Sequence, residues 1–299
     1  MISLFDLHCD TLLKAYLGSY SLWSSPLHIS LDKAADFATY NQVMAIWTDD
    51  RLNDHDGYLQ YLNIVEYAKN QKVLFANNFS NLSNSTFILA IEDARIIEDD
   101  LSRVDQFFSD GVRIITPVWK GINSIGGAWD TSVGLTEFGK NAICRMLELG
   151  ILVDISHASV ESAYDIMNIC ALFGAPPIAS HSNCLSVCNH KRNLSSKQFY
   201  ELASLGGIVG ICLCPEHLSS SGYATIDDIL NHIDAFLCLG WENKICLGCD
   251  FDGVSSLPLK ISGISDLKKL YFRIESTYDE KIANKIFFDN AFSFFKNLV

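Results

Sequence analysis

The chain alternates short apolar, β-branched runs with longer stretches in which apolar residues recur every three or four positions. Eight short runs predict β-strands: 2–8, 42–48, 87–93, 112–118, 151–157, 177–181, 208–214 and 244–250. Four of the longer stretches predict helices that close on a glycine: 134–150, 159–174, 196–206 and 225–240. Apolar strands that alternate with amphipathic helices are typical of a parallel sheet covered by helices. Eight such units predict a closed (β/α)8 TIM-like barrel of the α/β class.

The length of 299 residues suits one such barrel. No linker rich in proline or serine divides the chain, and no internal repeat is visible. We therefore expect a single barrel domain over 1–299, in which residues 254–299 form a C-terminal tail packed outside the barrel. Residues 18–30 and 119–133 are expected to be extended loops.

The charge balance limits the classes of partner. Asp and Glu number 35 against 22 Lys and Arg, a net charge of −13, which opposes binding to nucleic acid. No apolar run reaches the roughly 18 residues of a membrane span, and the N-terminus lacks the basic stretch of an export signal. We therefore expect no membrane partner and a cytoplasmic protein. The ten cysteines are expected to be reduced, with Cys212, Cys214, Cys246 and Cys249 assigned to the core.

Six polar residues share one position, the carboxyl end of a predicted strand. We call them the strand-end residues: His8, Asp10, Glu92, His157, His181 and Asp250. In a barrel these ends meet on one face, where the following loops build the active site. Histidine and carboxylate together are the ligand set of a zinc-type cation. His8 and Asp10 are two residues apart, so an extended chain points both side chains the same way. The shared position favours a metal centre.

Each of these residues also has an ordinary explanation when it is taken alone. A histidine at a strand end is often a hydrogen-bonded core residue, Glu92 could pair with a Lys or Arg, and Asp250 could belong to a turn. Arg192 follows His181 by eleven residues. Its guanidinium could grip a carboxylate through two parallel hydrogen bonds, or form a surface ion pair. The remaining histidines do not follow the pattern and are interpreted as bystanders: His28, His55, His190, His217 and His232.

Seven segments resemble, in order, a bacterial-type member of the membrane (renal) dipeptidase family, peptidase family M19. They are DLHCDT near the start, GVRIITPVW at 111–119, GLTEFGK at 134–140, LVDISH at 152–157, IASHSN…CNHKRN at 178–193, GGIVGI at 206–211 and LGCDFDG at 247–253. Members of this family are dinuclear zinc dipeptidases built on an amidohydrolase-like barrel. The resemblance implies hydrolysis of dipeptides, including those with a C-terminal D-residue, by a water that bridges two Zn²⁺ ions per chain.

The resemblance also implies a role for each strand-end residue. It assigns a first zinc to His8 and Asp10, a bridge between both zincs to Glu92, a second zinc to His157 and His181, and the base toward the bridging water to Asp250, near the first zinc. Glu92 and Asp250 are thus the expected catalytic carboxylates.

Three further residues fall on the substrate side of the family pattern. Arg192 stands where an arginine helps to anchor the bound dipeptide. Trp119 stands where the best-known members have a histidine that contacts substrate and supports the developing oxyanion. Together with Asn123 it forms a bacterial-looking W-x-G-x-N pattern, which we assign to substrate binding.

Two other interpretations stay open at this point. The chain could be a barrel metallohydrolase that acts on a non-peptide amide, a lactone or a phosphoester, and Arg192 would be superfluous for a neutral substrate. It could also be a catalytically silent homologue, although all six strand-end residues are present. The sequence leaves the oligomeric state open, a homodimer included.

Overall fold

The computed structural model describes residues 1–79, 82 and 85–298. It contains eight strands, and each overlaps one of the predicted runs. Their bounds are β1 Leu4–Cys9, β2 Tyr40–Trp47, β3 Phe87–Glu92, β4 Val112–Thr116, β5 Leu152–Val153, β6 Ile178–Ala179, β7 Ile208–Ile211 and β8 Ile245–Leu247.

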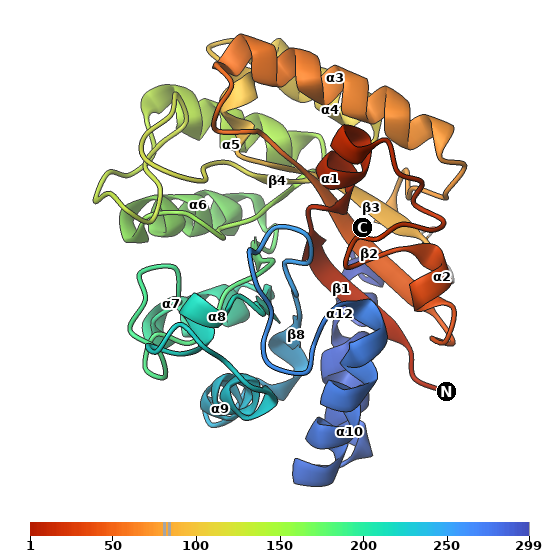
Figure 1. Ribbon diagram of the computed structural model, residues 1–299. Coiled ribbons are helices and arrows are strands. Elements are labelled where there is room, and N and C mark those ends of the chain that lie inside the picture. The colour runs from red at the N-terminus through yellow and green to blue at the C-terminus, as the bar shows by residue number, and fades with distance from the viewer. Residues whose placement is uncertain (80–81, 83–84, 299) are drawn as a thin grey trace.

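The strands form one parallel sheet that curls into a closed ring. Neighbouring strands follow the order β5-β4-β3-β2-β1-β8-β7-β6. A parallel bridge between Asp154 and Ile178 joins the segment after β5 to β6, and the Ile155 N–H donates to the Ile178 carbonyl at 2.8 Å. The helices surround this ring (Figure 1). The predicted (β/α)8 barrel is confirmed.

Helices connect consecutive strands on the outside of the barrel, and the last three helices follow β8. Their bounds are α1 Thr11–Gly18, α2 Leu31–Ala34, α3 Asp54–Asn70, α4 Ser102–Asp110, α5 Glu137–Glu148, α6 Val160–Phe173, α7 Ser196–Ser204, α8 Pro215–Leu218, α9 Ile226–Leu237, α10 Leu267–Thr277, α11 Glu280–Asn284 and α12 Asn290–Lys296. Short 3₁₀ segments lie at η2 Ala94–Ile97, η3 Glu242–Lys244 and η4 Ile264–Asp266, and a π-helical turn, η5, at Lys285–Asp289. Within the described ranges, no helix is both long and apolar enough to cross a bilayer.

The four helices predicted from sequence correspond to α5, α6, α7 and α9, and their ends follow local chemistry. Ser159 begins α6, where its side chain accepts a hydrogen bond from the Ser162 N–H at 2.9 Å. Gly174 ends α6 with a φ of 64°, a left-handed conformation that costs glycine little. Ser195 and Gln198 form a capping box at the start of α7.

The amino-terminal half of the barrel interior is an apolar layer to which every strand contributes. Its residues on the strands are Phe5, Leu7, Val43, Ala45, Ile88, Ala90, Ile114, Leu152, Ile178, Ile208 and Cys246. Helix α12 packs beneath this layer, where the buried Phe295 stacks on Phe5 with ring centroids 5.1 Å apart. The C-terminal helix thereby closes the amino-terminal mouth of the barrel.

A second apolar layer lies between the strands and the surrounding helices. It joins outward-facing strand residues such as Val209 to helix residues such as Phe199 of α7 and Phe236 of α9. The rings of the last two lie 4.4 Å apart. This layer fixes the helices on the barrel and so sets the positions of the loops that leave the strands.

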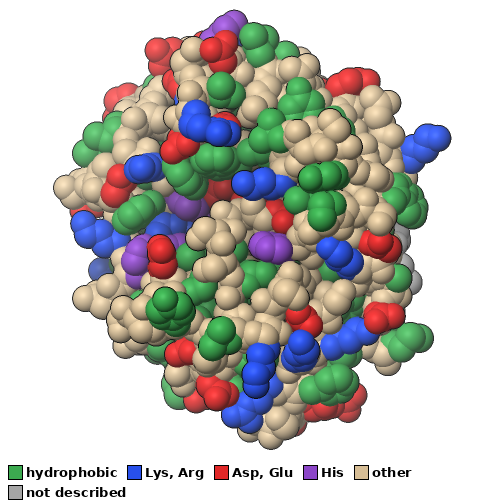
Figure 2. Space-filling model, in the orientation of Figure 1, with side chains coloured by type: hydrophobic (Ala, Val, Ile, Leu, Met, Phe, Trp, Pro, Cys, Tyr) green, Lys and Arg blue, Asp and Glu red, His purple; other side chains and the backbone are tan. Residues whose placement is uncertain are grey.

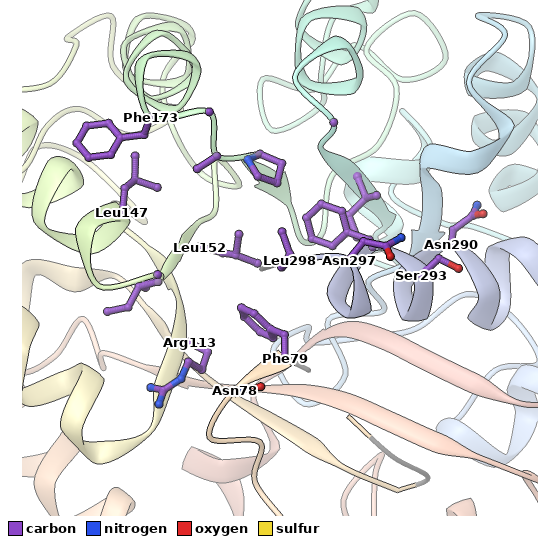
Figure 3. Close-up of a pocket in the computed structure, with 18 of the residues that line it drawn as sticks. Asn78, Phe79, Arg113, Leu147, Leu152, Phe173, Asn290, Ser293, Asn297 and Leu298 are labelled. Atoms are coloured by element: carbon purple, nitrogen blue, oxygen red, sulfur yellow. The ribbon is translucent and has the colours of Figure 1, made fainter. Parts of the chain in front are cut away.

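A hollow of 1320 Å³ lies at the amino-terminal mouth, beside α12. Figure 3 shows Phe79, Leu152 and Leu298 around it. Of its lining residues on the strands, Leu152 and Ile208 belong to the apolar layer at the strand starts, and the third is Arg113 of β4. The strand-end residues do not line this hollow, because they stand at the opposite ends of the strands.

The stacking of α12 on the barrel predicts a large stability loss on truncation of Phe295. Because this side chain is fully buried against Phe5 and Phe79, Phe295→Ala should lower the free energy of unfolding by about 3 to 5 kcal/mol. Urea denaturation measures the change. The matched control is Phe272→Ala, since Phe272 is 56% exposed on α10. If both variants lose a similar, small amount of unfolding free energy, α12 does not close the barrel as described.

Candidate metal centre

The strand-end residues converge at the carboxyl-terminal face of the barrel. The first group surrounds His8, which lies at the end of β1. Its Nε2 lies 3.7 Å from Asp10 Oδ2, 3.6 Å from Glu92 Oε2 and 3.9 Å from Asp250 Oδ1. Three strands, β1, β3 and β8, therefore direct one imidazole and three carboxylates to one point.

The second group surrounds the other oxygen of Glu92. Glu92 Oε1 lies 3.0 Å from His157 Nε2 and 3.4 Å from His181 Nε2, and the two nitrogens are 2.9 Å apart. His157 follows β5 and His181 follows β6. The Glu92 carboxylate thus stands between the two groups and presents one oxygen to each.

Two of the six residues need an unusual backbone conformation. His157 has a φ of 65° and Asp250 a φ of 59°, in the left-handed region that side chains rarely adopt. Such strain clusters at functional sites, where the surrounding structure enforces it. The Asp250 N–H donates to the His8 carbonyl at 3.1 Å, which helps to fix the turn after β8.

Gly253 leaves room for the carboxylates of the first group. A Cβ at this position would lie 2.2 Å from both Asp10 Oδ2 and Asp250 Oδ1. These two oxygens therefore converge over a residue that has no side chain. Any larger residue at position 253 would push them apart.

Burial governs the protonation of this cluster. Burial lowers the pKa of His157 to about 4, with the charge of Arg192 acting in the same direction. It also lowers the pKa of His181 well below its ordinary value, so both imidazoles are neutral. Burial alone would lower the pKa of His8, but attraction from Glu92 outweighs it and raises that pKa well above the ordinary value.

The carboxylates respond in opposite directions. Burial raises the pKa of Asp250 well above its ordinary value, and the charges of Asp10 and Glu92 add to this while His8 opposes it. For Glu92, burial also acts to raise the pKa, but His8 and His157 outweigh it and bring the value well below the ordinary one. Glu92 is therefore the carboxylate that is held ionised.

The donor set fits divalent cations. Among the described residues, His8 Nε2 and Asp10 Oδ1 are buried without a hydrogen-bond partner. Atoms bound 2.0–2.1 Å from one tetrahedral zinc stand about 3.3 Å apart, close to the 2.9–3.4 Å spacings within the second group. Two groups of potential ligands, His8/Asp10/Glu92 and Glu92/His157/His181, share Glu92. The two groups could each hold an ion.

Sequence reasoning missed the layer beneath the histidines. Asp154 accepts hydrogen bonds from Thr116 Oγ1 at 2.7 Å and from the Ser180 N–H at 2.9 Å. Ser180 Oγ in turn lies 2.7 Å from His181 Nδ1 and 3.5 Å from His8 Nδ1. Such contacts on the far ring nitrogen orient a metal-ligating histidine. The available signal was a polar residue two places after the inward-facing apolar residue of β4, β5 and β6.

Arg192 is buried beside the second group. Its Nη2 donates to the His181 carbonyl at 3.3 Å, while its Nε has no partner among the described residues. The side chain makes no ion pair with a described carboxylate within 4.0 Å. A buried guanidinium with unused donors is suited to binding an anion.

The two loop residues predicted on the substrate side differ in what their side chains do. Trp119 is half-buried, its carbonyl lies 3.1 Å from His157 Nδ1, and its ring lies 5.0 Å from that of Trp47. Asn123 uses its amide within its own loop and on Asp93, whose Oδ1 accepts from Asn123 Nδ2 at 3.2 Å. Its Nδ2 donates to the Pro117 carbonyl at 2.9 Å, and its Oδ1 accepts from the Ile125 N–H at 2.8 Å.

The cysteines divide between the core and the site. Cys246 and Cys249 lie in different core layers, as strand alternation predicts. Cys214 is half-buried. Cys212 is fully buried, yet its Sγ lies 3.9 Å from Asp250 Oδ2, so it borders the metal centre rather than belonging to the core alone.

Comparison with known families gives a match over nearly the whole chain. Residues 1–298 match the family described as membrane dipeptidase, peptidase family M19. An uncharacterised dipeptidase of Schizosaccharomyces pombe is 30% identical over 227 residues, which cover 73% of this chain and 52% of that protein. An uncharacterised protein of the pqqA 5′ region of Klebsiella pneumoniae is 28% identical over 70% of this chain and 80% of its own. The chain spans about half the length of the S. pombe relative.

Solved structures share the fold over the full chain. A metallopeptidase from Rhodobacter sphaeroides, liganded with a phosphinate mimic of the dipeptide L-Ala-D-Ala, is 22% identical with a TM-score of 0.89, over 100% of this chain and 99% of its own. A crystal structure described as dipeptidase AC is 23% identical with a TM-score of 0.91, over 99% and 98% of the two chains. With the family match over residues 1–298, these findings lead to one conclusion: the chain belongs to the membrane dipeptidase family, peptidase family M19.

Proposed function

We propose that this protein hydrolyses the peptide bond of dipeptides at a centre of two zinc ions. The observation that carries the proposal is the position of Glu92, which presents one carboxylate oxygen to each of two ligand groups. Family membership supports the reaction class, and the relative that binds an L-Ala-D-Ala mimic supports including dipeptides with a C-terminal D-residue. Zinc suits the mixed histidine and carboxylate ligands.

The proposed ligands are the strand-end residues. His8 and Asp10, with Asp250 beside them, would hold one ion, and His157 and His181 the other, with Glu92 shared between the two. Such ions lower the pKa of a water molecule and polarise the scissile carbonyl. Asp154, through Ser180, keeps the imidazoles of His8 and His181 in place.

Asp250 is the proposed general base. Its Oδ1 lies 3.9 Å from His8 Nε2, within the first ligand group, and burial raises its pKa as it does that of the neighbouring Asp10. Its left-handed backbone and the neighbouring Gly253 aim Oδ1 into the cluster. Asp250 would take the proton of the attacking water and return it to the leaving amine.

Asp252, two residues later, is not available as the general base, because both of its carboxylate oxygens accept hydrogen bonds elsewhere. Its Oδ1 accepts the His28 N–H at 2.8 Å, and its Oδ2 accepts the Thr11 hydroxyl at 2.6 Å. Both oxygens therefore serve to tie the loop before α2 and the start of α1 to the turn after β8. This leaves Asp250 as the carboxylate of that turn with an oxygen directed at His8.

Arg192 would anchor the free C-terminal carboxylate of the dipeptide. Its guanidinium is buried, lacks a described carboxylate partner and donates to the carbonyl of the candidate ligand His181. A planar guanidinium can bind a carboxylate through two parallel hydrogen bonds. We keep Trp119 as a proposed substrate contact, whereas Asn123 would act by shaping the loop that carries Trp119.

Replacing the proposed base should slow the chemical step. Asp250→Asn removes the proton acceptor with little change in volume, so kcat should fall by about a hundredfold or more. Steady-state hydrolysis by zinc-loaded protein measures kcat, and metal analysis of the same sample separates lost catalysis from lost zinc. Asp227→Asn on α9 is the control, because Asp227 lies on the surface and pairs with Arg273. A near-normal kcat in Asp250→Asn would contradict the assignment.

Changing the proposed anchor should weaken substrate binding alone. Lysine keeps the charge but lacks the planar fork, so Arg192→Lys should raise KM for dipeptides about tenfold or more, roughly 1.4 kcal/mol. Zinc content should stay unchanged. Arg273→Lys, at an exposed ion pair, is the matched control.

Amidation of the substrate tests the same contact from the other side. A dipeptide amide should be a poorer substrate for the wild type by a similar factor, and the amide should make little difference to Arg192→Lys. If the wild type cleaves free and amidated dipeptides equally well, the proposed anchor is wrong and a non-peptide substrate gains support.

A further inference from the structure

Three aromatic side chains from three different segments form a row at the carboxyl-terminal face. We call Trp129, His190 and His217 the ring row. The centroids of Trp129 and His190 are 5.6 Å apart, and those of His190 and His217 are 4.5 Å apart. Trp129 and His190 lie in the loops after β4 and β6, and His217 lies in α8 after β7, so the row depends on the closed barrel and is not a local sequence feature.

Both ends of the ring row are tied to the candidate metal centre. At one end, the backbone N–H of Trp129 donates to the backbone carbonyl of His157 at 2.8 Å. At the other, His217 Nδ1 lies 3.8 Å from Cys212 Sγ, the atom that lies 3.9 Å from Asp250 Oδ2. The row therefore runs along one side of the cluster. On the face shown in Figure 2, histidine side chains, in purple, gather beside a hollow.

Arg192 lies next to this row. Burial lowers the pKa of both His190 and His217, and the positive charge of Arg192 is the next cause in each case. The two imidazoles are therefore neutral. If Arg192 holds the terminal carboxylate of a dipeptide, as proposed above, we expect the side chain on the adjoining carbon to reach the row.

The hydrogen bonding of His190 defines which ring nitrogen carries its proton. The backbone N–H of Arg192 donates to His190 Nδ1 at 3.2 Å, so this nitrogen is the acceptor. The proton of the neutral ring is therefore on Nε2. His190 Nε2 has no hydrogen-bond partner within the part of the chain that the structure describes. The half-buried ring thus offers one unused N–H donor.

The backbone that carries His190 is fixed by hydrogen bonds. The His190 N–H donates to the Cys188 carbonyl at 2.8 Å, and its own carbonyl accepts from the Asn193 N–H at 2.9 Å. The Asn193 amide also donates to the carbonyls of Cys188 and His217, at 2.9 Å and 2.8 Å. These bonds join the loop after β6 to helix α8. A group fixed in this way binds its partner without first losing conformational freedom.

We propose that the ring row contacts the side chain of the substrate's C-terminal residue and that the His190 Nε2–H selects side chains that end in a carbonyl or carboxylate oxygen. The substrate class is dipeptides with C-terminal Asn or Asp. This inference rests on the proposed function, because Arg192 must first fix the terminal carboxylate. An apolar side chain of the same shape, such as Leu, would cover the donor without pairing it, which costs binding energy.

Charge is not the basis of this selection. Glu216 on α8 is exposed and raises the pKa of His190, so a negative charge already stands near the row. The neutral amide of Asn offers the same acceptor oxygen without repulsion from Glu216. The kcat/KM for dipeptides with C-terminal Asn or Asp should therefore exceed that for C-terminal Leu. The value for Asn should be at least equal to the value for Asp.

The test compares kcat/KM for Ala-Asn, Ala-Asp and Ala-Leu in zinc-loaded wild type, His190→Phe and His190→Gln. Wild type should favour Ala-Asn over Ala-Leu about tenfold, the value of one hydrogen bond. His190→Phe keeps a ring but removes the donor, so the ratio should fall close to one. His190→Gln supplies an amide N–H and should retain most of the ratio. His55→Phe is the control, because His55 is exposed at the start of α3.

Binding of the product amino acids separates this inference from the proposed function. Isothermal titration calorimetry measures the affinity of the protein for L-Asn and for L-Leu. The ratio of the two affinities gives the same selectivity without turnover. If no dipeptide is cleaved but wild type still prefers L-Asn and His190→Phe does not, the proposed function is wrong and the role of His190 stands. If dipeptides are cleaved with equal kcat/KM for Asn and Leu, or if the ratio survives in His190→Phe, the role of His190 is wrong.

Discussion

The site depends on the sharing of one buried carboxylate between two histidine groups. Glu92 stands at the end of β3 with His8 near one oxygen and His157 and His181 near the other. Neutral, buried imidazoles whose nitrogens face each other at 2.9 Å, beside further carboxylates, form an arrangement that divalent cations would stabilise. The closed barrel makes this convergence possible, because strands distant in sequence end on one face.

The rest of the interior supports that face in layers. The amino-terminal half is filled by apolar residues from every strand and closed below by α12, with Phe295 on Phe5. Above it lie Asp154 and Ser180, which connect to the histidines of both ligand groups. The polar chemistry is thus confined to the carboxyl ends of the strands. A large hollow at the opposite mouth, beside α12, takes no part in it.

The strands, the main helices and the strand-end residues could all be predicted from sequence, because hydrophobic periodicity marks each strand and a barrel brings strand ends together. What could not be predicted depends on contacts between loops. His190 and His217 look like bystanders along the chain, and only the packing of the loops after β6 and β7 brings their rings to 4.5 Å. The sequence places Cys212 in the core, whereas in the structure its sulfur contacts Asp250. Asn123 follows the family pattern, yet its amide is used inside its own loop and on Asp93.

The central claim, that Glu92 is shared between two metal ions, is tested most directly by counting metal. Inductively coupled plasma mass spectrometry of zinc-loaded, desalted protein should find about two ions per chain in the wild type, as in other two-metal sites. Glu92→Gln should hold clearly fewer, since a neutral amide is a poor ligand, while Glu137→Gln on the surface of α5 should keep both. A wild-type protein without metal, or two ions retained in Glu92→Gln, would contradict the account.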